Sequence, residues 1–264
     1  MTYEHIDMSL LDRPEILKEF FYPRKSQSKP LPSNAKDYFI EVDEGIKVGC
    51  RYYAIGKSYP SLLYFHGNGA IVDDFDQSAP LFNKMGINLF VATYRGYGSS
   101  NGTPTMTNMF KDSHRILEGF KKTVCDADFS RSLFVMGRSL GSLPAIELAY
   151  SNQDDFRGLI VDSGPSNNLR EWFSSIIPLN SPVVNDDSIF LNKVKLRLIH
   201  TPTLIIHGEK DSLIPVNEGK ELYDNSAAEY KRLVIIPNAD HNNLFDIGKK
   251  QYYKAIEEFV KDFC

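Results

Sequence analysis

The chain has 264 residues, of which 42% are hydrophobic and 24% charged, and its formal net charge is −4. This length and composition predict one soluble globular domain over residues 1–264. The slightly acidic balance, without a Lys/Arg cluster, argues against nucleic acid as a partner. Three scattered cysteines show neither metal-binding spacing nor a disulfide framework, and they favour a reducing cytoplasm.

The first part of the chain differs in composition from the rest. Residues 1–36 are rich in Pro, Ser and Lys, with a short helical pattern at 16–20, and we expect this segment to wrap the domain. We expect neither a signal peptide nor an integral membrane segment, because no suitable apolar run is present. Next, residues 38–42 and 47–53 flank Asp43-Glu44-Gly45, which predicts an antiparallel hairpin.

Short apolar runs then alternate with helical patterns along the chain. The expected strands lie at 62–65, 89–92, 133–136, 159–161, 204–206 and 233–236. The expected helices lie at 75–85, 109–121, 140–150, 217–225 and 249–263. Because the strand runs are continuously apolar, we expect each strand to be buried on both faces. The pattern predicts an α/β fold with a mostly parallel central sheet and helices on both faces.

One stretch interrupts this alternation. Residues 164–200 carry apolar and aromatic side chains without a clear strand–helix rhythm, between two expected core strands. A long insertion at this place is typical of a small cap over a site. A pair of packing helices without a gating role is an equally good interpretation.

The most informative motif is Gly137-Arg138-Ser139-Leu140-Gly141, which follows the apolar run at 133–136 and precedes a helical pattern. A Gly-x-Ser-x-Gly sequence between a strand and a helix is typical of a nucleophile elbow. The glycines allow a tight turn that exposes the serine hydroxyl above the sheet edge. We therefore expect Ser139 to be the nucleophile that attacks an acyl carbon.

A serine at its ordinary pKa needs a base, and the base needs an orienting carboxylate. The carboxylate candidate is Asp211, which follows the apolar run at 204–206 and precedes Leu213-Ile214-Pro215. Its position at the carboxyl edge of a parallel sheet is where ligands bind in such folds. Glu209 is the competitor, for which we prefer the role of a solvated loop carboxylate.

The base candidate is His241, in a polar loop after the last expected strand. We do not expect the other five histidines to act as the base. Two of them, His66 and His207, lie at strand ends beside glycines and are expected to be structural supports. Asp240 is expected to be a loop carboxylate and not the orienting acid, because adjacent residues point apart.

The oxyanion of such a reaction needs hydrogen-bond donors. One candidate is the backbone N–H of Leu140, directly after the nucleophile. The other is expected in the glycine-rich loop at 66–70, where we favour the Asn68 N–H, with that of Gly69 second.

Three motifs together resemble a known superfamily. They are His66-Gly67-Asn68-Gly69, Tyr94-Arg95-Gly96-Tyr97-Gly98 and Gly137-Arg138-Ser139-Leu140-Gly141. With the chain order Ser139, Asp211, His241, the sequence from about residue 38 onward resembles the α/β-hydrolase superfamily. Within it, the three motifs together are similar to those of serine hydrolases of the ABHD13/ABHD17 and Bem46-like group. The resemblance implies an α/β-hydrolase fold, a position for a cap at the insertion, and serine hydrolase chemistry.

The sequence as a whole thus predicts a serine hydrolase that cleaves a carboxylic ester or thioester through an acyl-enzyme. The expected partner is a small-molecule acyl substrate, and no cofactor or metal is needed. Two alternatives stay open. One is a peptidase, amidase or acyltransferase that uses the same three residues. The other is a non-catalytic hydrolase-like binding protein, against which the presence of all three residues argues.

Overall fold

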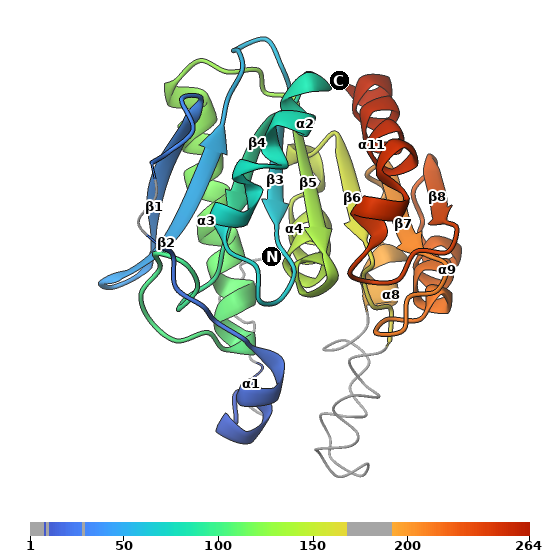
Figure 1. The fold of residues 1–264 in the computed structure, drawn as a ribbon, viewed down its shortest axis with the longest axis horizontal. Coiled ribbons are helices and arrows are strands. Elements are labelled where there is room, and N and C mark those ends of the chain that lie inside the picture. Colours follow the sequence, from blue (N-terminus) through green and yellow to red (C-terminus); the bar gives the residue numbers. More distant parts are fainter. Residues whose placement is uncertain (1–7, 9–10, 28–29, 168–191) are drawn as a thin grey trace. The chain divides into compact units, whose positions relative to one another are not determined.

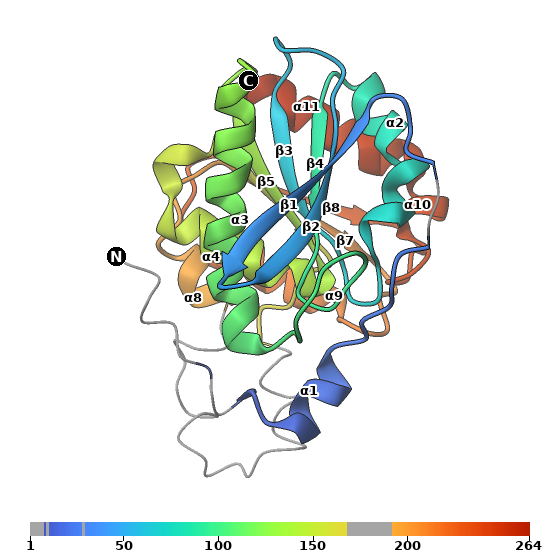
Figure 2. The same ribbon diagram turned by 90° about the vertical axis from the view of Figure 1, so that its left-hand side faces the viewer.

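The computed structural model describes residue 8 and residues 11–27, 30–167 and 192–264. The chain forms two compact units, residues 1–135 and 136–264, and each unit is described by itself (Figures 1 and 2). Within each unit, helices cover both faces of the strands, as the sequence predicts. Most of the predicted cap, residues 168–191, lies outside the described residues.

The first unit begins with α1 (Pro14–Phe20) and an antiparallel hairpin of β1 (Ala35–Asp43) and β2 (Ile46–Tyr53). β2 pairs antiparallel with β4 (Asn88–Ala92), and β4 pairs in parallel with β3 (Ser61–Phe65). The strand order in this unit is therefore β1-β2-β4-β3. The predicted hairpin is confirmed.

Two helices, α2 (Ala79–Lys84) and α3 (Met106–Asp126), lie on opposite faces of the first unit's strands (Figure 2). The helix predicted at 75–85 is present but shorter, because only Ala79–Lys84 of this segment is α-helical. A 3-10 helix, η3 (Val72–Asp76), precedes α2, and α2 is a separate helix with Pro80 in its first turn. Proline has no backbone N–H and fits only the first turn of a helix, so a helix begins there and does not continue through it.

The second unit contains the strand order β5-β6-β7-β8. β5 (Leu133–Arg138) enters it from the end of the first unit, followed by β6 (Gly158–Asp162), β7 (Thr203–Gly208) and β8 (Lys231–Ile236). β6, β7 and β8 pair in parallel. The prediction that β8 is buried on both faces is wrong. Four of its six residues are half-buried, because β8 ends the strand order and lacks a neighbour on one side.

The helical elements of this unit follow the strands in turn. They are η4 (Ser139–Gly141), α4 (Ser142–Ser151), η5 (Gln153–Asp155), α8 (Asn192–Leu196), α9 (Val216–Asn225), α10 (Leu244–Ile247) and α11 (Lys249–Phe263). α4 and α11 lie on opposite faces of the strands (Figures 1 and 2). Because β6, β7 and β8 are parallel, the loops that follow them emerge at one edge, where a site is expected.

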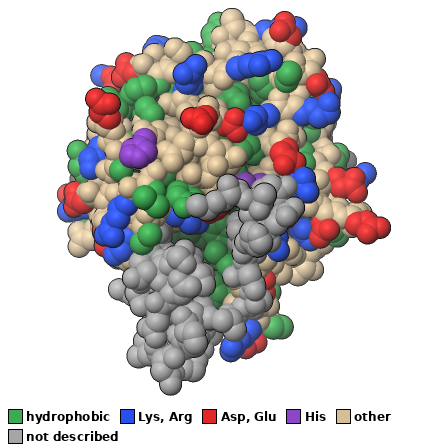
Figure 3. All heavy atoms as spheres, turned by 180° about the vertical axis from the view of Figure 1, so that it is seen from behind, with side chains coloured by type: hydrophobic (Ala, Val, Ile, Leu, Met, Phe, Trp, Pro, Cys, Tyr) green, Lys and Arg blue, Asp and Glu red, His purple; other side chains and the backbone are tan. Residues whose placement is uncertain are grey.

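The face drawn in Figure 3 carries interspersed basic and acidic side chains over its described atoms. Within residues 11–27, 30–167 and 192–264, no helix combines the length and apolar character that crossing a bilayer requires. The expected cytoplasmic location and the expected lack of nucleic-acid binding stay predictions.

Candidate active site

Ser139 lies at the turn between β5 and α4, as the elbow motif predicts. Its φ is +51°, a left-handed conformation that is strained for a residue with a side chain. Gly137 makes this turn possible. A Cβ on Gly137 would lie 2.6 Å from the Ser142 Cα and would also meet the Gly141 backbone. The Ser142 hydroxyl donates to the Ser139 carbonyl oxygen at 2.7 Å and closes the turn from the helix side.

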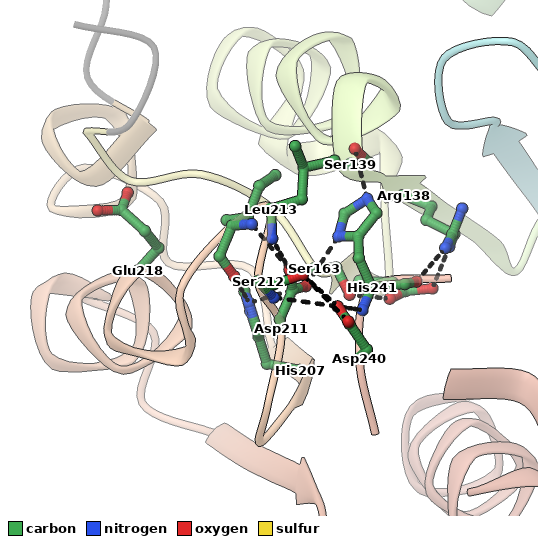
Figure 4. Close-up of polar contacts among 12 residues, drawn as sticks. Arg138, Ser139, Ser163, His207, Asp211, Ser212, Leu213, Glu218, Asp240 and His241 are labelled. Carbon is green, nitrogen blue, oxygen red and sulfur yellow. Dashed lines mark hydrogen bonds and ion pairs between the residues drawn. The ribbon is translucent and has the colours of Figure 1, made fainter. Parts of the chain in front are cut away.

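The structure brings Ser139, His241 and Asp211 together through two hydrogen bonds (Figure 4). His241 Nε2 lies 3.0 Å from Ser139 Oγ, and His241 Nδ1 lies 2.8 Å from Asp211 Oδ2. Ser139, His241 and Asp211 are 9%, 3% and 6% exposed, respectively. With the Nδ1 proton donated to the carboxylate, Nε2 has a lone pair directed at the serine hydroxyl. This arrangement permits proton transfer from Ser139 to His241.

A tight turn after β7 fixes the Asp211 carboxylate. Asp211 Oδ1 accepts the N–H of Leu213 at 3.0 Å and that of Ile214 at 2.7 Å, which leaves Oδ2 for His241. Glu209, the competing carboxylate, is exposed and accepts the Asn238 N–H at 2.8 Å. The structure thus places Asp211, and not Glu209, against His241.

Asp240 joins the loops that follow β7 and β8. Its Oδ1 accepts the N–H of Ser212 at 3.0 Å and the N–H of His241 at 2.6 Å. These bonds, that of Ser212 first, lower the pKa of the Asp240 carboxyl below its usual range. Asp240 accepts the backbone N–H of His241, in keeping with the role of a loop carboxylate.

His207 holds the turn that carries Asp211. The ring is fully buried, its Nε2 donates to the Ile214 carbonyl oxygen at 2.8 Å, and it lies 3.5 Å from Asp211 Oδ2. Gly219 on α9 leaves room for the ring, because a Cβ there would lie 2.5 Å from His207 Nδ1. The predicted structural role of His207 is confirmed.

The two predicted oxyanion donors lie in different units. Leu140 follows Ser139 at the start of the helical turn η4, in the second unit. Asn68 lies on the loop after β3, in the first unit, and its side chain binds the N-terminal segment. Asn68 Oδ1 accepts the Tyr22 N–H at 3.1 Å, and Nδ2 donates to the Phe20 carbonyl oxygen at 2.6 Å.

His66 stabilises the loop after β3, which carries Asn68. Its Nδ1 donates to the Gly67 carbonyl oxygen at 2.8 Å, and its Nε2 accepts the Thr93 hydroxyl at 2.7 Å. Complete burial lowers the pKa of His66 from 6.5 to about 4. The predicted structural role of His66 is also confirmed, and the ring is neutral at physiological pH.

Stability should fall in acid because of this histidine. Between pH 6.5 and pH 4, the unfolded chain binds a proton at His66 that the folded protein does not. Lowering the pH through this window should therefore cost on the order of 3 kcal/mol of unfolding free energy. Urea unfolding at pH 7 and pH 4.5 measures the difference, which should shrink in His66→Gln. The exposed His200→Gln variant is the control, and an unchanged pH dependence in His66→Gln would contradict the assignment.

The sequence reasoning missed two charged residues near His241, the half-buried Arg138 and the buried Asp162. Arg138 binds the His241 backbone, and Asp162 ends β6, buried beside Arg138. Asp162 carried a usable signal, since it is a polar residue at the end of an apolar strand, like the candidates that were chosen. Arg138 carried none apart from its place in the elbow motif.

Comparisons with known proteins agree with this architecture. Residues 57–185 and 192–248 match the protein family described as "Serine aminopeptidase, S33". The chain is 26% identical to the Bem46 protein of Schizosaccharomyces pombe, over 78% of this chain and 69% of that protein. It is 25% identical to the "Alpha/beta hydrolase domain-containing protein WAV2" of Arabidopsis thaliana, over 87% and 79%. Among solved structures, an esterase of Pyrococcus furiosus aligns with a TM-score of 0.71 and 20% identity, over 91% of this chain and 98% of that one.

Proposed function

The chain belongs to the hydrolase family described as serine aminopeptidase S33 and has the predicted α/β-hydrolase fold, and we propose that it is a serine hydrolase of carboxylic esters or thioesters. One observation carries the proposal, namely the continuous hydrogen bonding from Asp211 through His241 to Ser139. The position of Ser139 at a strained turn supports it, because strain of this kind gathers at functional sites.

In the proposed mechanism, His241 Nε2 accepts the Ser139 proton while Oγ attacks the carbonyl carbon of the substrate. Asp211 stabilises the imidazolium that forms and keeps its Nδ1 proton in place. His241 then gives its proton to the leaving alcohol or thiol as the tetrahedral intermediate collapses to an acyl-enzyme. A water molecule, deprotonated by His241, attacks the acyl carbon, and its proton returns to Ser139 as the carboxylic acid leaves.

The developing oxyanion is assigned to the backbone N–H groups of Leu140 and Asn68, with Gly69 as the second choice for the latter. Each such donor typically stabilises the transition state by roughly 3–4 kcal/mol. Backbone donors need no particular side chain, so the loop geometry around Gly67 and Gly69 carries this function. The mechanism needs no cofactor and no metal.

Esters and thioesters lead the substrate classes because their leaving groups need less assistance than an amine. The name of the Pyrococcus furiosus neighbour, an esterase, makes an ester the first substrate to test. Peptide hydrolysis is the second candidate, and the description of the matching family as a serine aminopeptidase favours it.

A fluorophosphonate probe tests the chemistry independently of substrate identity. The folded wild type should be labelled at Ser139, Ser139→Ala should not be labelled, and His241→Ala should be labelled at least about 10²-fold more slowly. Ser151→Ala, at the exposed end of α4, is the matched serine control and should be labelled like the wild type. No labelling of folded wild type, or labelling that His241→Ala leaves unchanged, would overturn the proposal.

A substrate panel then separates the reaction classes. It contains acyl esters and acyl thioesters of graded chain length, together with aminoacyl anilides. Higher kcat/KM values for esters or thioesters support the proposal. Anilides as the best substrates would replace it with the peptidase.

A further inference from the structure

Arg138, the residue before Ser139, binds the backbone of the proposed base. Its Nη2 donates to the His241 carbonyl oxygen at 2.5 Å (Figure 4). The Arg138 side chain is only 16% exposed, so water competes little for this hydrogen bond. The end of β5 and the loop after β8 are thereby joined beside the imidazole.

Two other contacts fix the guanidinium group of Arg138. Its Cζ lies 5.1 Å from the centroid of the Phe245 ring, a cation–π arrangement with α10, which directly follows the His241 loop. Its Nε lies 3.6 Å from Asp162 Oδ2. A planar guanidinium held by a carbonyl oxygen, a ring and a carboxylate has little freedom left.

The Asp162 carboxylate is built into the core of the second unit. It has no exposed surface, and it accepts the Tyr252 hydroxyl at 2.9 Å and the Ser163 hydroxyl at 2.9 Å. Ser163 has a φ of +50°, so strained serines follow both β5 and β6. A buried carboxylate requires both hydrogen bonds and a compensating charge, and Arg138 supplies that charge.

We propose that Arg138, held by Asp162, is a positioning residue that keeps the His241 imidazole at hydrogen-bonding distance from Ser139 throughout proton transfer. The inference rests on the proposed function, because it concerns the same nucleophile and base. Asp211 fixes the ring at Nδ1, whereas Arg138 fixes the backbone to which the ring is attached. Misplacement of reacting groups by about 1 Å can cost 10²-fold in rate.

The ion pair between Arg138 and Asp162 also affects the electrostatics around His241. His241 becomes a cation during the reaction, and an isolated guanidinium beside its backbone would oppose that charge. Asp162 cancels the charge of Arg138, so the guanidinium forms a fixed hydrogen bond without a net repulsive field. Lysine would keep the charge but lose the planar geometry that reaches the carbonyl oxygen.

The first measurements use Arg138→Met, which keeps the apolar stem and removes the guanidinium. We expect kcat and the fluorophosphonate labelling rate of Ser139 to fall about 10- to 100-fold, with KM changed less than about threefold. Arg138→Lys should restore part of the loss. Arg232→Met is the control, because Arg232 forms a half-exposed ion pair with Glu258 in the same unit and should leave both rates unchanged.

Arg138→Met leaves Asp162 buried without its cation, so a loss of stability could by itself lower the activity. The double variant Arg138→Met/Asp162→Asn removes both charges, while the new amide oxygen at residue 162 still accepts the Tyr252 hydroxyl. We expect the thermal unfolding midpoint of the double variant to return toward the wild-type value. The labelling rate should nevertheless stay low, because the bond to the His241 carbonyl is still missing.

The outcomes separate the two proposals. A folded wild type that is not labelled contradicts the proposed function. A labelled wild type with Arg138→Met labelled as fast as Arg232→Met overturns the positioning role. Recovery of the labelling rate together with stability in the double variant also overturns it, since Arg138 would then serve only the fold.

Discussion

Replacement of Asp211 with Asn should lower kcat about 10⁴-fold while the protein stays folded. The amide oxygen of the new side chain would still accept the N–H groups of Leu213 and Ile214, so the turn after β7 is preserved. The amide nitrogen would instead face His241 Nδ1 and donate to it. The imidazole would then carry its proton on Nε2, where it could not accept the proton of Ser139.

Asp240→Asn is the matched control for this change, because Asp240 lies beside His241 and was the adjacent carboxylate candidate. An amide oxygen at residue 240 still accepts the backbone N–H groups of Ser212 and His241. We expect kcat to stay within about threefold of wild type, because the hydrogen bonds that hold the loop are retained. Steady-state kinetics on one ester measures both variants. Equal losses in the two variants would remove the special role of Asp211.

Replacement of Gly137 with Ala should destabilise the protein by more than about 4 kcal/mol or prevent folding. The new Cβ would lie against the carbonyl group of Gly141 and 2.6 Å from Ser142 Cα, and backbone atoms cannot swing aside like a side chain. β5, the Ser139 turn and α4 would have to separate. Urea denaturation of the purified protein, or its yield in soluble form, measures the effect.

Gly45→Ala distinguishes steric collision from backbone strain alone. Gly45 has a φ of +70°, yet a Cβ there would meet no atom within 4 Å. Only the strain of the left-handed conformation remains, about 1–2 kcal/mol. A Gly137→Ala loss no larger than that of Gly45→Ala would mean that the elbow can relax.

Much of the fold and the candidate site could be predicted because local signals and topology agree. The apolar runs predicted the strands. The polar residues that follow the carboxyl ends of these strands predicted Ser139, Asp211 and His241 as site residues. Parallel pairing of β6, β7 and β8 brings the loops after β7 and β8 to one edge, so Asp211 and His241, 30 positions apart, form a hydrogen bond. The order of the strands and helices was enough to predict that these residues, far apart in the sequence, lie close together.

Other features depend on tertiary contacts that no local pattern encodes. β8 has the same apolar pattern as the inner strands, and only its place at the end of the strand order exposes it. Arg138 looks like a variable position of the elbow motif, and its importance comes from a carbonyl oxygen 103 residues away. The single-domain organisation and the cap over the site stay predictions.

The contacts of the N-terminal segment decide where a fragment of this protein can begin when it is expressed. The family match begins at residue 57, yet the Asn68 amide binds the backbone of Phe20 and Tyr22. Arg24 adds a hydrogen bond from its Nε to the Gly69 carbonyl oxygen at 2.6 Å. A fragment trimmed to the matched region would lose all of these bonds, together with the hairpin that pairs with β4. The family match therefore begins inside the first folding unit, and expression should begin upstream of Pro14, before α1.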